Sequence, residues 1–491
     1  MIRRHRILLL VSLSSCLLAQ ATIEKASPIV SALQDKNYER ALKLLRPALA
    51  SHPANAQLWA MQGSAYIGEG KNKEALMSFR RALRISPDDL PALQGAAQIE
   101  YEAGSPAAIP LIEHVMRMRP ADLTSHGMLA VLYYQLGNYA GAVEQFEMAG
   151  TLFDSQPGAL HAYAVCLVKV KRFDEAAKTI QRTLALDPGS ESERQLLASV
   201  QVMANQPTAA LATLAPLLKT GTPNAGTLEL ASSAYEEAKD TTQAVGSIKQ
   251  AILLDPRNVN LYLDFANISY AHGSFQVGIE VINDGMALQP KAAPLYFARG
   301  VLYVQLTQYD KAEEDFEKAY ELDPSQSLSA AAQGLTAAQA NDFDRALLKV
   351  KASLARNQND PLLLYLQAEI LAQSHSDSSA PGFRLAVRSA QRAIALQPTL
   401  GAAHGVLAKL YLQSGNYQEA AVECRKALAS NPADQAAVYH LIQALRKREE
   451  TQEIPNLLKR LAVLRQEAEK NERDRYRFKL IEGDTPPQAL N

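Results

Sequence analysis

Histidine and cysteine are the side chains of this chain that could hold a metal ion or attack a substrate, and they are few. Nine histidines and three cysteines are scattered along 491 residues. His114 and His126 could be considered as a ligand pair, but two histidines alone are a weak signal for a metal. The motifs His-Glu-x-x-His, Gly-x-Ser-x-Gly, Cys-x-x-Cys and the P-loop are absent from the sequence, so hydrolytic, redox and phosphate chemistry lack their usual patterns. We therefore predict a non-catalytic protein with no metal and no cofactor.

What recurs instead is a pattern of aromatic and small residues with a period of 34 residues. Between 123 and 327, unit starts fall at 123, 157, 191, 225, 259, 293 and 327. The segment 56–89 carries Trp59, Gly63, Tyr66, Ala75, Phe79, Ala82 and Pro87. At the same offsets, 293–326 carries Tyr296, Gly300, Tyr303, Ala312, Phe316, Ala319 and Pro324. In 401–434 these offsets hold His404, Ala408, Tyr411, Ala420, Cys424, Ala427 and Pro432.

This pattern resembles the tetratricopeptide repeat, whose unit is a helix–turn–helix. The resemblance implies an all-α fold, an α-solenoid of about 13 tandem repeats that form a superhelix. Unit starts at 22, 56, 90, 123, 157, 191, 225, 259, 293, 327, about 362, 401 and 435 place the solenoid at 22–452. Each unit of such a fold contacts only its neighbours, so the length does not require several globular domains.

Residues 293–326 show how a unit is expected to fold. Apolar residues recur at spacings of three and four over 294–306 and 309–322, which predicts two helices. Gly300 and Ala319 have little or no side chain, so the two helices can approach closely. Two units depart from the pattern: Pro110 is expected to kink or delay the second helix of the unit at 90, and 374–382 form a polar insertion between helices.

The first 21 residues predict an export signal. Arg3, Arg4 and Arg6 precede an apolar stretch, 7–13, that is too short to cross a bilayer. Ala19-Gln20-Ala21 is a small-x-small cleavage pattern, which would release a chain that begins at Thr22. A second interpretation stays open, because Leu13-Ser14-Ser15-Cys16 resembles a bacterial lipobox, and Cys16 would then carry lipid. The expected location is the periplasm or cell envelope, as a soluble, secreted or membrane-anchored protein.

The other cysteines and the charge balance argue against further classes. Cys166 and Cys424 lie about eight repeats apart, whereas a disulfide needs Cα atoms within about 7 Å. We expect two small buried side chains instead. The chain has 50 Lys and Arg against 51 Asp and Glu, a net charge of −1. This balance supplies no basic face for nucleic acid, so we expect a protein or peptide partner, and membrane contact only through a lipid anchor.

The C-terminal segment is densely charged, with an apolar stripe formed by Leu457, Leu458, Leu461, Leu464 and Ala468. We predict that 453–480 is a helix that caps the solenoid, because a terminal repeat needs a polar outer face. A short coiled-coil site for a partner is the alternative. Residues 481–491 are predicted to be a disordered tail.

The resemblance implies that partners bind a concave face lined by positions 2, 5, 9, 12 and 13 of each first helix. Family members that clamp an acidic C-terminus use Lys and Arg there, but Lys169 and Lys409 are the basic residues found. Members that grip a peptide backbone repeat Asn at position 6, where this chain has Met61, Asp264 and Val406. Neither specialised mode is therefore expected.

An apolar, nearly uncharged cluster remains on that face. Its residues are Asn260, Leu263, Asn267, Tyr270, Phe297, Val301 and Val304, with Tyr134 of the same class upstream. Aromatic side chains supply contact area and Asn can pair with backbone groups, so the cluster suits a peptide or an amphipathic helix. The alternative is that curvature of the solenoid buries these residues against the next unit.

These features predict an exported, non-catalytic scaffold for protein–protein contacts in the cell envelope. The alternative function is an accessory subunit, held to the membrane by lipid on Cys16, of an envelope machine for secretion, pilus assembly or exopolysaccharide export.

Overall fold

The computed structural model describes residues 28–220, 223–324, 327–339, 342–374 and 377–475. These residues form 26 α-helices and one 3₁₀ turn, Gly150–Phe153, and no strand occurs among them. The predicted all-α fold of paired helices is therefore confirmed. The predicted export signal at 1–21, with Cys16, and the predicted tail at 481–491 lie outside the described residues.

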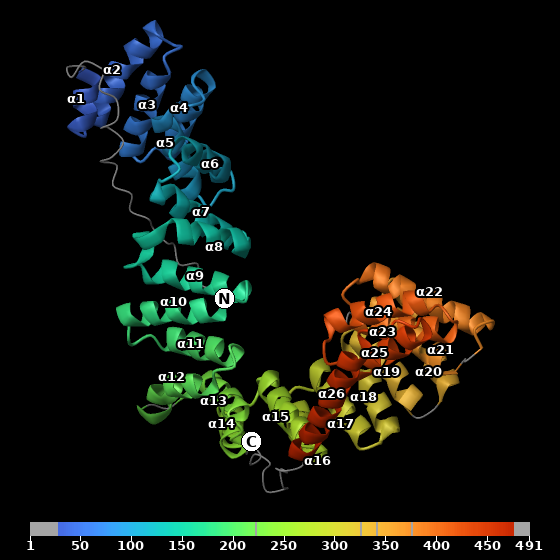
Figure 1. The fold of residues 1–491 in the computed structure, drawn as a ribbon. Coiled ribbons are helices and arrows are strands. Elements are labelled where there is room, and N and C mark those ends of the chain that lie inside the picture. Colours follow the sequence, from blue (N-terminus) through green and yellow to red (C-terminus); the bar gives the residue numbers. More distant parts are fainter. Residues whose placement is uncertain (1–27, 221–222, 325–326, 340–341, 375–376, 476–491) are drawn as a thin grey trace. The chain divides into compact units, whose positions relative to one another are not determined.

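The chain divides into two compact units, Met1–Lys219 and Thr220–Asn491. In the first unit, helices that follow one another in sequence also follow one another in space (Figure 1). Its helices are α1 (Pro28–Gln34), α2 (Tyr38–Ser51), α3 (Ala56–Gly68), α4 (Asn72–Ile85), α5 (Leu90–Glu102), α6 (Ala108–Met118), α7 (Leu123–Gln135), α8 (Tyr139–Met148), α9 (Pro157–Lys169), α10 (Phe173–Leu186), α11 (Glu191–Met203) and α12 (Pro207–Thr220).

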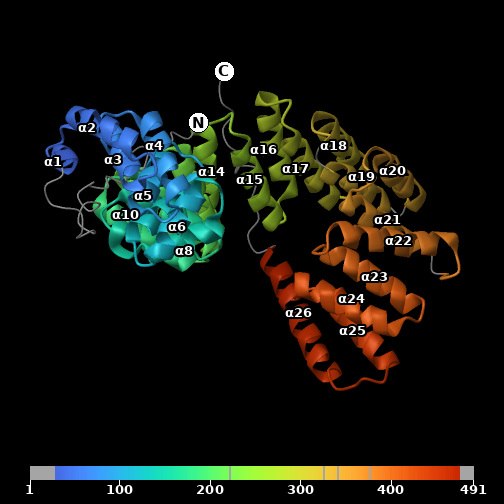
Figure 2. The ribbon, with the colours of Figure 1, turned by 90° about the horizontal axis from the view of Figure 1, so that it is seen from above.

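The second unit continues the same pattern, and its last four helices lie side by side in chain order (Figure 2). Its helices are α13 (Ala225–Glu237), α14 (Thr241–Leu254), α15 (Val259–Ala271), α16 (Phe275–Leu288), α17 (Ala293–Gln305), α18 (Tyr309–Leu322), α19 (Ser327–Gln339), α20 (Phe343–Arg356), α21 (Pro361–Ser374), α22 (Pro381–Leu396), α23 (Gly401–Gln413), α24 (Tyr417–Ser430), α25 (Gln435–Lys447) and α26 (Ile454–Arg475).

The predicted repeat starts coincide with the starts of the odd-numbered helices. From 56 to 435, each first helix begins at its predicted position, apart from α21, which begins at Pro361 rather than about 362. In the first repeat, α1 begins at Pro28. The second helix of the unit at 90 begins late, at Ala108, with Pro110 in its first turn, as predicted. Of the insertion predicted at 374–382, Ser374 is the last residue of α21, Pro381 and Gly382 begin α22, and 375–376 lie outside the described residues.

The same turn separates the two helices of nearly every repeat. Its second residue has a positive φ, which favours glycine, and Gly70, Gly104, Gly137, Gly273 and Gly415 occupy this position in five repeats. In six others the position holds a residue with a side chain, namely Lys36, Lys171, Asn205, Lys239, Thr307 and Glu449. Repeat geometry therefore fixes this backbone conformation even where the local sequence does not favour it.

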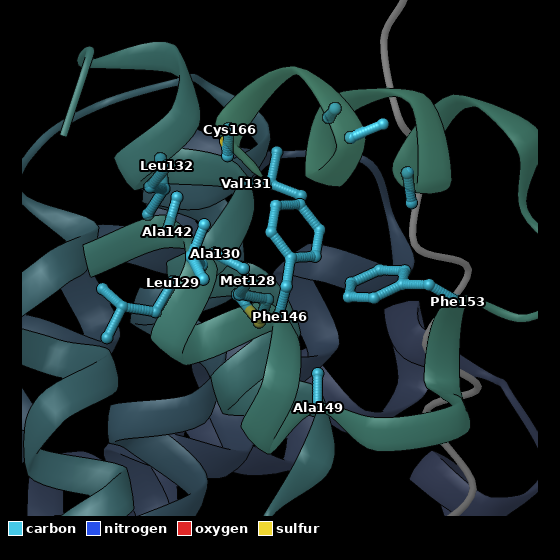
Figure 3. Packing of buried hydrophobic residues seen from close by; sticks show 14 of the residues in the cluster. Met128, Leu129, Ala130, Val131, Leu132, Ala142, Phe146, Ala149, Phe153 and Cys166 are labelled. Atoms are coloured by element: carbon cyan, nitrogen blue, oxygen red, sulfur yellow. The ribbon is translucent and has the colours of Figure 1, made fainter. Parts of the chain in front are cut away.

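Small residues allow aromatic rings to fill the space between paired helices. In the first unit, Phe146 and Phe153 pack edge to face with ring centroids 5.3 Å apart, among buried residues of α7, α8 and α9 (Figure 3). Cys166 lies in this core and Cys424 lies in the core around α24. Both are buried free thiols, and burial raises the pKa of each to about 12. They are small core side chains, as expected.

The helix predicted at 453–480 is α26, which is described as far as Arg475 and pairs with α25. Ile454, Leu457 and Leu461 are buried in the core that α25 and α24 contribute, whereas Leu458 is 44% exposed. The apolar stripe therefore divides, with one edge packed on the solenoid and the other facing outwards.

Candidate functional site

The histidines that could have suggested chemistry form part of the scaffold. His126 lies 2.8 Å (Nδ1) from Gln145 and 3.0 Å (Nε2) from the carbonyl of Pro120. His114 Nε2 lies 2.7 Å from a carboxylate oxygen of Asp88. Across the described part of the chain, no group of three or more His, Cys, Asp and Glu side chains could hold a metal ion.

His126 belongs to a recurrent tether at the fourth position of the first helix. Side chains with a polar tip at this position reach the carbonyl of a proline six residues earlier. The contacts are Trp59 to Pro53 (2.9 Å), His126 to Pro120 (3.0 Å), Arg194 to Pro188 (2.9 Å), Tyr262 to Pro256 (2.8 Å), Tyr296 to Pro290 (3.1 Å) and His404 to Pro398 (3.0 Å). The position thus requires length and a terminal donor more than aromatic character, which explains how Arg can replace Trp.

The candidate binding residues on α17 line an open groove of about 220 Å³. Phe297, Val301 and Val304 form one side, and α19 supplies the other side through Ala331, Ala332, Leu335, Thr336 and Gln339. Gln305, Phe316 and Leu362 complete it. No residue of this lining is charged. The groove can therefore receive an apolar side chain from outside, and its rim offers amide groups but no ions.

The remaining candidate residues do not line this groove. Asn260, Asn267 and Tyr270 lie exposed on α15, and Leu263 is half-buried there. The ring of Tyr270 is 6.0 Å from that of Phe275. Tyr134 lies on α7 in the first unit, half-buried against the core that contains Phe146, and burial raises its pKa. The predicted cluster is therefore two adjoining surfaces on α15 and α17, with Tyr134 in the other unit.

Sequence reasoning missed the α19 side of the groove. Leu335 is 41% exposed and occupies the same repeat position as Val301, so a signal was present. The sequence alone does not indicate that this position of α19 faces α17 across a groove. Thr336 and Gln339 carry no such signal, since a polar residue on a first helix is unremarkable by itself.

The guanidinium group of Arg299 links α17, which lines the groove, to α16 and α18. Arg299 on α17 donates two hydrogen bonds to Asp315 on α18, at 2.8 and 2.7 Å, and a third to Asn283 on α16, at 2.6 Å. Its guanidinium also lies 5.9 Å from the ring of Tyr296 and 5.8 Å from that of Tyr303. Bidentate pairing and ring contacts fix a planar guanidinium more firmly than a single ion pair does. These contacts therefore hold α17, which forms one side of the groove, against α16 and α18.

Two half-buried carboxyl groups on the helices preceding the groove have raised pKa values. Burial raises the pKa of Glu229 on α13, and the charge and hydrogen bond of Asp264 raise it further. Burial also raises the pKa of Asp264 on α15, although its hydrogen bond with Glu229 lowers it.

A second, more open pocket of about 380 Å³ lies at the turns between α9 and α10 and between α11 and α12. Its lining mixes signs, with Lys171, Arg172, Asp174 and Glu175. Arg172 forms ion pairs with Glu147 and Glu175, at 2.7 and 2.5 Å. These charges pair with one another, so we assign no ligand to this pocket.

Comparison with known proteins agrees with this architecture. A family model described as "Tetratricopeptide repeat" matches residues 293–326, the predicted unit that contains Phe297 and Val301. A second model of that description matches 382–435 and 406–453. The chain is a tetratricopeptide repeat protein. Residues 24–158 also match a model described as "Cytochrome c-type biogenesis protein H TPR domain".

Several tetratricopeptide relatives are similar over part of their length. The formate-dependent nitrite reductase complex subunit NrfG of Escherichia coli O157:H7 is 22% identical over 124 residues, which cover 24% of this chain and 63% of NrfG. The Hsp70-Hsp90 organizing protein of Triticum aestivum is 21% identical over 244 residues, covering 47% and 40%. Superkiller protein 3 of Schizosaccharomyces pombe is 28% identical over 123 residues, covering 23% and 9%. This chain spans less than two thirds of each.

Among solved structures, yeast Tom70 is 20% identical, with a TM-score of 0.45 and coverage of 91% of this chain and 93% of Tom70. The Cut9-Hcn1 hetero-tetramer of APC/C matches with 13% identity and a TM-score of 0.36, covering 85% and 95%.

Within the tetratricopeptide solenoid, none of the described helices has both the length and the apolar character needed to cross a bilayer.

Proposed function

We propose that this chain is an exported, non-catalytic scaffold that holds a segment of a partner protein in the groove between α17 and α19. The observation that carries the proposal is the lining of the groove, which is apolar, free of charge and open on one side. Phe297, Val301 and Val304 are half-buried, so part of each side chain can still be covered by a ligand. Burying apolar surface stabilises a complex by about 25 cal/mol per Å² before the costs of association.

A peptide library displayed on phage tests this proposal. Random 12-residue peptides selected against the full chain should share an apolar anchor residue. Leu335→Asp places a charge in the groove and should abolish binding of the selected peptides. Leu348→Asp is the matched control, because Leu348 is 69% exposed on α20 and does not line the groove. Peptides that bind the wild type and Leu335→Asp equally well would contradict the proposal.

A more specific role is that of an accessory subunit in the assembly of c-type cytochromes or a related envelope complex. The match of 24–158 to the cytochrome c-type biogenesis model and the similarity to NrfG support it. Deleting the coding region from the source organism should then lower the covalently bound haem of its c-type cytochromes, measured by haem staining after denaturing electrophoresis. Unchanged haem attachment would favour an accessory role in a secretion, pilus or exopolysaccharide export machine.

Export is part of the proposal and can be tested separately. A fusion of residues 1–30 to alkaline phosphatase should be active, because this enzyme needs the oxidising environment outside the cytoplasm. Labelling with a fatty acid in the full chain and in Cys16→Ser separates a lipoprotein from a chain cleaved after Ala21. An inactive fusion would contradict export.

A further inference from the structure

We propose that the second unit pairs with a second copy of this chain through the exposed faces of α18, α20 and α22, about a two-fold axis that runs along α20 past Leu348. The pairing goes beyond the proposed function and does not depend on it, because none of the residues that carry it lines the groove. Those residues are Glu314, Leu348 and Arg388, which occupy one repeat position in three successive second helices.

The three residues are equivalent because each follows a buried alanine by two positions. These alanines have no exposed area and are Ala312 in α18, Ala346 in α20 and Ala386 in α22. Glu314 and Arg388 are exposed, and Leu348 is 69% exposed. A single exposed leucine is ordinary by itself. Here, however, one repeat position presents an acid, an apolar residue and a base in turn.

α20 lies between α18 and α22 in the second unit. Arg345 of α20 forms an ion pair with Glu313 of α18. On its other side, Leu347 of α20 packs against the core that contains Phe383 and Ala386 of α22. Figure 2 shows the three helices following one another in chain order. Leu348 is therefore flanked by the acidic helix α18 and the basic helix α22.

The charges of these two flanking helices are opposite. α18 has six acidic residues and two lysines, whereas α22 has three arginines and no acidic residue. Arg384, Arg388 and Arg392 are spaced four residues apart and are all exposed, so they form one stripe on α22. Glu314 and Arg388 take part in none of the ion pairs formed by the described residues. Both charges can therefore meet a partner from outside.

A second copy of this chain fits this pattern, because the surface is complementary to itself. A two-fold axis along α20 exchanges the two flanks, so that Glu314 of each copy faces Arg388 of the other, and Leu348 faces Leu348. Such an interface uses one surface twice, as is usual in dimers of identical chains. An acidic protein or an anionic lipid surface would suit α22 but would be repelled by α18, since like charges brought together lower affinity. Both signs of charge beside one leucine thus favour the second copy.

The pairing has a consequence for the proposed scaffold. A pair of chains would carry two grooves between α17 and α19, one in each copy. A partner with two apolar segments would then bind more tightly than either segment alone, without any new kind of contact.

The test is the mass of the full chain in solution, measured by sedimentation velocity as its concentration is raised from about 1 to 100 μM, the weak range expected of a small interface. The wild type should shift from monomer to dimer. Glu314→Arg and Arg388→Glu should each associate at least about tenfold more weakly, because each places like charges opposite one another twice. Glu144→Arg is the matched control and should associate as the wild type does, since Glu144 is exposed at the same repeat position of α8 in the first unit.

The decisive sample mixes the two charge variants in equal amounts. The Glu314→Arg chain has bases at both positions and the Arg388→Glu chain has acids at both, so the mixture should form heterodimers about as strongly as the wild type forms its dimer. This recovery also shows that both variants are folded. Leu348→Asp should weaken the pairing and keep peptide binding in the groove.

Three results would each overturn the pairing: a wild type that stays monomeric, a dimer that survives Leu348→Asp, or charge variants that stay apart when mixed. Sedimentation of a monomeric wild type with phosphatidylglycerol vesicles, lost in Arg388→Glu, would assign α22 to an anionic lipid surface instead. None of these results affects the proposed function, which fails if Leu335→Asp keeps peptide binding.

Discussion

Gly300 of α17 and Phe316 of α18 lie so close that no side chain fits between them. A Cβ atom on Gly300 would lie 2.6 Å from Cε1 of Phe316, whose side chain is buried. Gly63 and Phe79 repeat the relationship in the first unit, where the corresponding distance would be 2.5 Å. Glycine inside a helix costs about 0.5–1 kcal/mol relative to alanine. Its presence here is therefore explained by the close approach of paired helices.

Replacing Gly300 by Leu should destabilise the second unit by about 1–3 kcal/mol, the usual cost of overpacking a core. Because repeats couple mainly to their neighbours, hydrogen exchange should increase chiefly within 259–360. Gly405→Ala is the control, since a Cβ atom there would meet no atom within 4 Å, and it should stabilise by up to about 1 kcal/mol. If both substitutions change the free energy of unfolding in the same direction, the close-approach explanation is wrong.

Thr307 lies in the turn between α17 and α18 with a φ of 56°, a conformation that is unusual for a β-branched residue. Thr307→Gly should raise the free energy of unfolding by about 1 kcal/mol, because glycine adopts this conformation without steric cost. Gly273 occupies the same turn position one repeat earlier, with a φ of 64°, and Gly273→Thr should cost a similar amount. Denaturant unfolding followed by circular dichroism measures both. A loss of stability in Thr307→Gly would show that its side chain contributes more than the backbone costs.

These turns show what the sequence could and could not predict. The period located the start of nearly every first helix, because packing residues such as Gly300 and Phe316 recur wherever helices touch. It did not reveal that Lys171 or Thr307 adopts a left-handed conformation, since those residues carry no local signal for one. Of the groove, only the α17 side could be predicted from the sequence. Val301 stood out on α17, whereas its opposite wall on α19 depends on how successive repeats are brought together in space.

The tether from the fourth position of each repeat should contribute to stability. Tyr262 is buried and its hydroxyl donates to the carbonyl of Pro256 at 2.8 Å. Tyr262→Phe removes this bond without changing the ring, so the free energy of unfolding should fall by about 1 kcal/mol. Tyr439→Phe on α25 is a suitable control, because Tyr439 is 46% exposed. Equal effects of the two substitutions on the denaturation midpoint would argue against the tether.

His161 links two repeats of the first unit and should make their contact depend on pH. Its Nδ1 lies 2.6 Å from Glu193 on α11, and this hydrogen bond raises the pKa of His161, while burial opposes the shift. A histidine whose pKa is higher in the folded state stabilises fully below its unfolded pKa, about 6.5. That contribution is lost as the pH rises through the folded pKa. The protection factors of amides in α9 and α11, which correct for the intrinsic rise of exchange with pH, should therefore fall as the pH rises above the unfolded pKa of about 6.5, and His161→Gln should remove this dependence.

The division of the predicted cluster gives the sharpest test of the binding surface. Leu335 lines the groove and is 41% exposed, whereas Tyr270 is 39% exposed but lies outside the lining. If the groove receives the anchor, Leu335→Ala should weaken peptide binding about tenfold or more, as for a central contact residue, and Tyr270→Ala should change it by less than about threefold. Phe297→Ala is less informative, because its ring also packs 5.5 Å from that of Phe316 and its loss should lower the melting temperature as well. Titration calorimetry with one selected peptide measures all three. A larger loss in Tyr270→Ala than in Leu335→Ala would move the anchor from the groove to the polar surface of α15, where aromatic contact with the ligand would then dominate.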